Sequence, residues 1–254
     1  MLGYSAAGFA VGLLVGLTGV GGGSLMTPVL VLLFGIQPVT AVGTDLLYAS
    51  ITKSAGTVVH GLNRSVDWRI TRRLLMGSVP ATAATLLALY YLAPHSRSSH
   101  LISIILGLAL ILTAISLLLR NRVLHYAGRG VGRISQARIS TLTVTTGAAL
   151  GVLVSLSSVG AGALGITALI FLYPTLPTAR IVGSDIAHAV PLTLLAGLGH
   201  WAMGSVDLGL LGTLILGSLP GIVLGSYLSS RVPDAVLRFV LAITLAVVGG
   251  KLAF

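Results

Sequence analysis

The chain has no cysteine and no glutamate, and its five acidic residues are all aspartates. Without cysteine it can form neither a disulfide nor a thiolate metal site. Charged residues make up only 8% of the sequence, against about 25% in a soluble domain, so they cannot cover a water-facing surface. The chain also lacks a nucleotide-binding loop, a metal-ligand cluster and a nucleophile elbow. We therefore expect no cofactor, no metal and no enzymatic activity.

Apolar residues fill the chain instead: they make up 55% of it, and the mean hydropathy is +1.03. Several apolar stretches are long enough to cross the roughly 30 Å hydrocarbon core of a bilayer. Such stretches must be helices or a closed barrel, and continuous apolar runs favour helices, since barrel strands alternate. The net charge of +10 would suggest nucleic acid in a soluble protein, but these basic residues lie mainly in short connections, where they orient a membrane protein. We expect an all-α polytopic membrane protein with no nucleic-acid partner.

One sequence pattern occurs twice along the chain. The stretch Val42–Asp45 recurs 140 residues later as Val182–Asp185. The other matched elements are Ser65–Asp67 with Ser205–Asp207, Gly77–Pro80 with Gly217–Pro220, and His60 with His200. We divide the chain into a first repeat at 1–119, a basic linker at 120–138 and a second repeat at 139–254.

Each repeat is predicted to contain a glycine-interrupted pair of short helices followed by three full transmembrane helices. In the first repeat the expected segments are 3–18, a break at 19–23, then 24–35, 40–61, 70–93 and 100–119. In the second they are 139–157, a break at 158–162, then 163–174, 179–202, 208–229 and 235–253. The first two short helices would be about 24 and 18 Å long, too short to span untilted. Each pair therefore either crosses once as a broken helix or enters and returns as a hairpin.

The distribution of basic residues favours the hairpin. If each pair crosses once, the repeats are parallel, and ten of the fourteen cations other than Lys53 share the side of the linker. If each pair is a hairpin, the repeats are inverted, and twelve of these cations lie on the side of the linker. Because basic residues concentrate on the cytoplasmic side, we expect inverted repeats and a cytoplasmic linker. Two thin crossings in place of each hairpin would give the same sidedness. Inverted repeats with interrupted helices are typical of secondary transporters, whose sites lie near the bilayer midplane.

The two glycine breaks are the first candidate site. A helix that begins at a break has unpaired N–H groups and a partial positive charge, which suit an anion. Glycine also lets a ligand approach the backbone. The candidate substrate-binding residues are Thr18, Gly19, Gly21, Gly22, Gly23 and Ser24 in the first repeat, and Ser157, Ser158, Gly160 and Gly162 in the second. The alternative is that these small residues only permit tight helix packing.

Lys53 is the second candidate, because it lies near the middle of the expected span 40–61. A lysine at the bilayer centre costs about 2.5–3.5 kcal/mol on insertion scales, and such charges usually mark a pathway. We expect it to bind an anionic substrate or to pair with an aspartate. The alternatives are a lysine that extends to the membrane interface or one held in a static pair.

Asp45 and Asp185 each lie about five residues inside an expected span. They are candidates for carrying coupling protons, and His188 shares a helical face with Asp185 and can join a proton relay. The alternative is that each aspartate caps its helix, a role that the preceding hydroxyl residue can also fill. Asp67 and Asp207 begin the following spans and are expected to cap them.

The motifs at Gly16–Ser24 with Pro28, and at Ala41–Asp45, resemble those of the TauE/SafE-type sulfite exporter family. Val159–Gly162 and Val182–Asp185 repeat the pattern more weakly. The likeness covers nearly the whole chain. It implies a permease for small sulfur-containing anions, such as sulfite, thiosulfate, sulfonates or sulfoacetate-like compounds, in the cytoplasmic (inner) membrane of a bacterium or archaeon.

We therefore predict a secondary transporter for such anions that works by alternating access and is coupled to protons or to the membrane potential. Its partners would be the small anion and membrane lipid. An anion channel would use the same residues without alternating access. An intramembrane enzyme would instead use Asp45 and Asp185 as a catalytic pair. Both a monomer and a homodimer fit the sequence.

Overall fold

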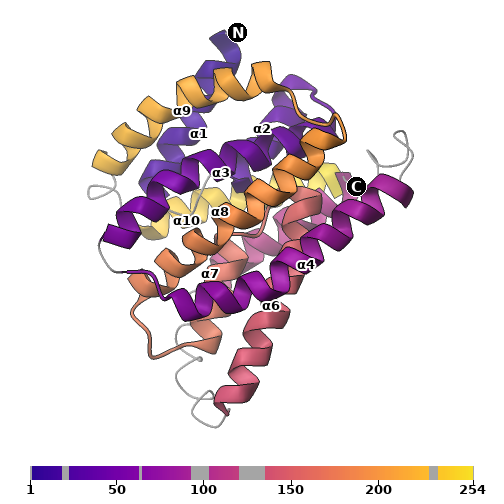
Figure 1. Ribbon diagram of the computed structural model, residues 1–254. Coiled ribbons are helices and arrows are strands. Elements are labelled where there is room, and N and C mark those ends of the chain that lie inside the picture. The colour runs from indigo at the N-terminus through magenta and orange to yellow at the C-terminus, as the bar shows by residue number, and fades with distance from the viewer. Residues whose placement is uncertain are drawn as a thin grey trace.

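The computed structural model describes residues 2–18, 23–62, 65–92, 103–119, 135–228 and 234–253. Throughout these residues the chain folds into helices joined by short connections, and no strand occurs among them (Figure 1). The prediction of an all-α fold is confirmed.

The helices follow the expected order along the chain. Their bounds are α1 Leu2–Thr18, α2 Gly23–Phe34, α3 Pro38–Leu62, α4 Trp68–Leu92, a helix at Ser103–Leu119, α6 Gln136–Ser157, α7 Ala163–Leu172, α8 Thr178–Ala202, α9 Leu208–Leu228 and α10 Asp234–Ala253. One difference is that α6 begins at Gln136 and not at 139, because Ser135 caps it by accepting from the N–H of Arg138 at 3.4 Å.

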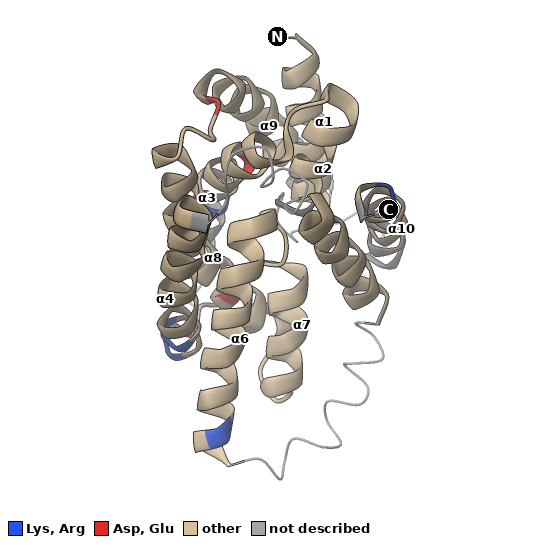
Figure 2. Cartoon of the chain, turned by 90° about the vertical axis from the view of Figure 1, so that its right-hand side faces the viewer, with Lys and Arg blue, Asp and Glu red and all other residues tan. Residues whose placement is uncertain are grey.

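In the described part of the chain, four helices are long and apolar enough to cross a membrane, namely α4, α6, α8 and α9. Large apolar side chains are exposed on these helices, among them Leu87, Leu216 and Val223. A soluble monomer rarely exposes such extensive apolar surface, whereas contact with lipid requires it. Basic residues gather at the starts of α4 and α6, which lie at one end of the molecule (Figure 2). This is the distribution expected of the cytoplasmic side.

Two helix pairs repeat the same packing: α1 lies against α9, and α6 lies against α4. Glycines of α1 and α6 approach backbone carbonyls of the facing helix so closely that an added Cβ would overlap them. The matched contacts are Gly8 with Leu214, Gly12 with Ser218, Gly147 with Leu74 and Gly151 with Ser78. The two repeats match in these contacts: the contact of Gly8 with Leu214 corresponds to that of Gly147 with Leu74, and the contact of Gly12 with Ser218 corresponds to that of Gly151 with Ser78. Small residues of this kind permit close helix approach in membranes.

The counterpart helices α3 and α8 pack against each other in antiparallel directions. Gly43, near the start of α3, lies against the backbone of Ser205, which follows α8. Gly197, near the end of α8, lies against Leu47, near the start of α3. The pair that joins the repeats therefore runs in opposite directions.

Two matched hydrogen bonds connect the repeats at this contact. The N–H of Asp207 donates to Oγ1 of Thr44 at 3.1 Å. The N–H of Asp67 donates to Oγ of Ser184 at 2.8 Å. The hydroxyl residue that precedes each buried aspartate thus holds the start of a helix in the other repeat.

Asp67 and Asp207 cap α4 and α9, so this prediction is confirmed. Oδ1 of Asp67 accepts from the N–H groups of Arg69 at 3.0 Å and Ile70 at 3.4 Å. Oδ1 of Asp207 accepts from the N–H of Leu210 at 2.9 Å. Each carboxylate satisfies donors that a helix leaves unpaired at its start.

Loss of either cap should destabilise the protein. We expect Asp67→Ala and Asp207→Ala each to lower the free energy of unfolding by about 1 kcal/mol, while asparagine, which caps equally well, restores most of it. Thermal unfolding of the purified variants in detergent measures the difference. Equal stability of the alanine and asparagine variants would show that the caps contribute nothing.

Candidate functional site

The break between α6 and α7 is a buried turn. Gly160 and Gly162 have φ angles of 119° and 126°, a region that favours glycine. Ser158 has a φ of 58°, so α6 ends in a left-handed cap. Ser157 holds the turn, because its Oγ accepts from the N–H of Val159 at 3.2 Å.

Lys53 reaches this break from α3. The residue is only 6% exposed, and its Nζ donates to the carbonyl of Ala161 at 3.0 Å. The ammonium also lies within electrostatic reach of the carboxylates of Asp185 and Asp45. The lysine therefore stays inside the protein and does not extend to a membrane interface. It connects the first repeat to the broken helix of the second.

Asp45 lies beside the early part of α2. Its Oδ2 accepts from both the backbone N–H, at 3.2 Å, and the hydroxyl of Thr27. Its Oδ1 makes no hydrogen bond in the described part of the chain. The carboxyl group lies close to Ser158, whose Oγ is likewise buried and unpaired there. Asp45 thus faces the break of the opposite repeat.

Asp185, on α8, has its carboxylate beside the start of α7. Neither of its oxygens makes a hydrogen bond in the described part of the chain, although the carboxylate lies beside the backbone of Gly162. Gly165, in the first turn of α7, leaves room for it, because a Cβ there would overlap Oδ1. The N-cap residue of α7 is Gly162, which makes no side-chain capping bond, and a helix N-terminus favours a negative charge. Asp185 therefore occupies the kind of position that the sequence predicted for a substrate anion.

A hydroxyl–histidine contact extends the site along α8. His188 is fully buried, one turn after Asp185, and its Nε2 is hydrogen-bonded to Oγ of Ser78 at 2.9 Å. The corresponding residues of the other half are Tyr48 and Ser218. The buried hydroxyl of Tyr48 lies close to Ser218 but makes no hydrogen bond to it. The arrangement therefore recurs, with histidine in one half and tyrosine in the other.

Of the two matched histidines, only His200 has a described side chain, and it contacts the backbone of α6. Nε2 of His200 donates to the backbone carbonyl of Ser155 at 2.9 Å, which joins α8 to α6. The side chain of His60 lies outside the described residues.

The structure describes the first glycine break only at its edges. Gly19, Gly21 and Gly22 lie outside the described residues. Thr18, Gly23 and Ser24 are described only by their backbone, with α1 ending at Thr18 and α2 beginning at Gly23. Most of the expected break at 19–23 therefore lies outside the described residues, Gly23 already belongs to α2, and the predicted role of the break in binding stays a prediction.

We use the term central cluster for Asp45, Lys53, Ser158, Asp185 and His188. Buried polar atoms normally have hydrogen-bond partners, and leaving one unpaired costs about 1–3 kcal/mol. Here both oxygens of Asp185, Oδ1 of Asp45 and Oγ of Ser158 are buried and unpaired within the described chain. Such a concentration around one ammonium is suited to binding a proton or a small polar solute.

The family described as Sulfite exporter TauE/SafE matches residues 4–252. The chain belongs to this family. It is 40% identical over 250 residues to the probable membrane transporter protein YjnA of Bacillus subtilis (strain 168), with 96% of each chain covered. It is 28% identical over 249 residues to the probable membrane transporter protein YdhB of the same organism, with 97% of each covered. No solved structure gives a significant match.

The resemblance seen in the sequence is therefore confirmed, and the chain is a multi-pass membrane transporter. Several residues of the candidate site in this TauE/SafE protein were missed by the sequence reasoning. Ser78 gave a signal, because it recurs as Ser218 in a matched stretch. Tyr48 gave a weaker one, since it takes the position of His188. Thr27 gave none, because only the folded contact with Asp45 distinguishes it from other threonines.

Gly165 should be needed for both stability and transport. We expect Gly165→Ala to lower the free energy of unfolding by about 1–3 kcal/mol, because the new methyl group would displace Asp185 from the start of α7. Transport should fall with it. Gly212→Ala is a matched control, because nothing lies within 4 Å of a Cβ at that position. Thermal unfolding and transport assays should show a loss of stability and transport in Gly165→Ala and none in Gly212→Ala. Equal stability and equal transport in the two variants would contradict the close contact at Asp185.

Proposed function

We propose that this transporter moves small sulfur-containing anions, such as sulfite, thiosulfate, a sulfonate or a sulfoacetate-like compound. The observation that carries the proposal is a buried ammonium, Lys53, that reaches the broken helix of the opposite repeat near two buried carboxylates. An oxyanion could accept hydrogen bonds from Lys53 and from backbone N–H groups of the break. The family description names sulfite export.

The two repeats would sit inverted in a bacterial or archaeal inner membrane and rock against each other. The antiparallel contact of α3 with α8 supports the inversion, as does the reciprocal packing of α1 on α9 and of α6 on α4. The basic starts of α4 and α6 would lie in the cytoplasm together with the linker 120–138. Rocking at the α3–α8 contact would open the central cluster to each side in turn.

Competition for the start of α7 would couple the anion to a proton. While Asp185 is ionised, its charge occupies the helix N-terminus and repels an incoming anion. Protonation removes that charge, so the anion can take the position with Lys53 as its counter-charge. Anion and proton then cross together, and His188 and Ser78 extend a route for the proton along α8.

A binding screen tests the substrate class. One or more of sulfite, thiosulfate, taurine and sulfoacetate should raise the temperature at which the purified protein unfolds. A ligand at about 100 times its Kd stabilises the native state by about 2.7 kcal/mol. Uptake of the same anion into proteoliposomes should then saturate. Flux that never saturates would indicate a channel, and stabilisation by chloride alone would contradict a sulfur-anion carrier.

A further inference from the structure

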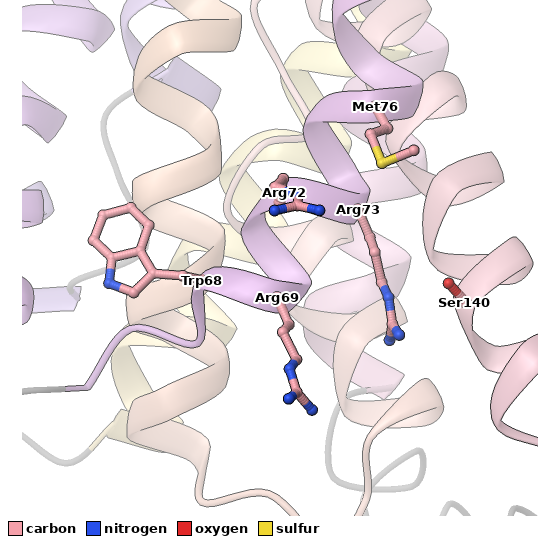
Figure 3. A pocket seen from close by; sticks show the side chains of 6 residues that line it. All are labelled: Trp68, Arg69, Arg72, Arg73, Met76 and Ser140. Carbon is pink, nitrogen blue, oxygen red and sulfur yellow. The ribbon is translucent and has the colours of Figure 1, made fainter.

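A basic pocket lies at the start of α4 and shares no residue with the central cluster. It has a volume of about 480 Å³ and is lined by Trp68, Arg69, Arg72, Arg73, Met76 and Ser140. All but Ser140 come from the first turns of α4, and Ser140 lies near the start of α6 (Figure 3). The pocket therefore opens between two helices at the end of the molecule where basic residues gather (Figure 2).

Every charged residue that lines this pocket is an arginine. Arg69 and Arg72 are exposed. Arg73 is held toward α6, because its Nη1 donates to the hydroxyl of Tyr173 at 3.3 Å, and that hydroxyl is hydrogen-bonded to Oγ1 of Thr143 at 2.8 Å. The guanidinium group presents a planar set of donors that matches a phosphate. The pocket thus concentrates phosphate-binding groups, one of them fixed in position.

Exposed apolar side chains adjoin the arginines on the same helix. Trp68 is 63% exposed and Met76 is 62% exposed. Further along α4, Val79 and Leu87 are exposed as well. Because α4 is apolar enough to span the membrane, this face meets lipid, with its arginines near the headgroups and its apolar residues near the acyl chains. Tryptophan is also common at that boundary.

The pocket has no counterpart in the second repeat. The positions that correspond to the three arginines hold Gly209, Gly212 and Thr213 in α9, and Leu208 replaces the tryptophan. The transport mechanism proposed above uses none of these pocket residues, so it does not account for three arginines on one side. Orientation in the membrane needs basic residues near the cytoplasm, but it does not need them to share a pocket with exposed apolar side chains.

We propose that this pocket binds an anionic phospholipid of the cytoplasmic leaflet. Arg69 and Arg72 hold the phosphate, Arg73 marks the inner wall, and an acyl chain runs along Met76. Basic pockets between transmembrane helices on the cytoplasmic side bind such headgroups. The proposal does not depend on which solute the protein transports.

Native mass spectrometry of the purified protein tests the site. The wild type should retain a phosphatidylglycerol molecule through washing and should not retain phosphatidylcholine. Arg69→Gln with Arg72→Gln should weaken retention about tenfold or more. The matched control is Arg138→Gln with Arg180→Gln, which removes two exposed arginines that do not line the pocket. The control should retain the lipid as the wild type does.

Several outcomes would overturn the proposal. Equal losses in the two double variants would show attraction by overall charge, and no loss in the pocket variant would show that the arginines do not bind lipid. Displacement of the lipid by millimolar inorganic phosphate would assign the pocket to a free anion. If the pocket variant fails to fold, photoreactive phosphatidylglycerol on the wild type decides the question. Crosslinks should then map to the starts of α4 and α6, and crosslinks spread over the other helices would refute the site.

Discussion

Replacing Lys53 with methionine is expected to reduce anion transport about tenfold to a hundredfold while the protein still folds. Methionine keeps much of the length and volume of the lysine side chain but removes the ammonium. Hydrogen bonds to charged groups contribute about 1.5–3 kcal/mol, and the upper value corresponds to about a hundredfold in an equilibrium constant. The fold loses one bond, to the carbonyl of Ala161, whereas the glycine contacts between helices remain.

The second lysine of the chain supplies the control. Lys251 is exposed near the end of α10, so Lys251→Met removes the same charge away from the central cluster. Uptake into proteoliposomes measures transport, and thermal unfolding with size-exclusion chromatography reports folding. Transport at the wild-type rate in Lys53→Met would remove this lysine from the mechanism. Comparable losses in both variants would show that lysine removal harms the protein in general.

The helices and the repeat could be predicted because their signals are local in the sequence. Asp67 and Asp207 follow a loop and precede an apolar run, and they cap the next helix as that position indicates. Ser135 escaped notice because it lies within a basic linker and not directly before an apolar run. Because Ser135 caps α6, the helix begins at Gln136, three residues before the predicted start at 139.

The contacts inside the site could not be predicted, because they depend on packing between distant segments. Ser157 and Ser158 look alike in the sequence. The left-handed conformation at Ser158 separates them: Ser157 holds the turn, and the hydroxyl of Ser158 stays unpaired near Asp45. The bond between Asp45 and Thr27 likewise arises only when α2 folds against α3.

Replacing both buried aspartates, Asp45→Asn with Asp185→Asn, is expected to abolish accumulation of the anion driven by a pH gradient. A gradient of about two pH units supplies about 2.7 kcal/mol per proton, enough for about a hundredfold accumulation with one coupled proton. Asparagine keeps the shape and still accepts from Thr27, but it cannot exchange a proton. Proteoliposomes whose membrane potential is clamped at zero should therefore equilibrate the anion and not concentrate it.

The control for this variant is Asp67→Asn with Asp207→Asn, which removes the same number of carboxylates while asparagine still caps both helices. It should accumulate the anion like the wild type. Full pH-driven accumulation by the Asp45 and Asp185 variant would show that these carboxylates carry no coupling proton. The single variants should then rank the two aspartates. Asp45 is held by two bonds from Thr27, whereas Asp185 makes none in the described chain. Asp185 is therefore the group freer to exchange its proton, and Asp185→Asn should remove most of the coupling by itself.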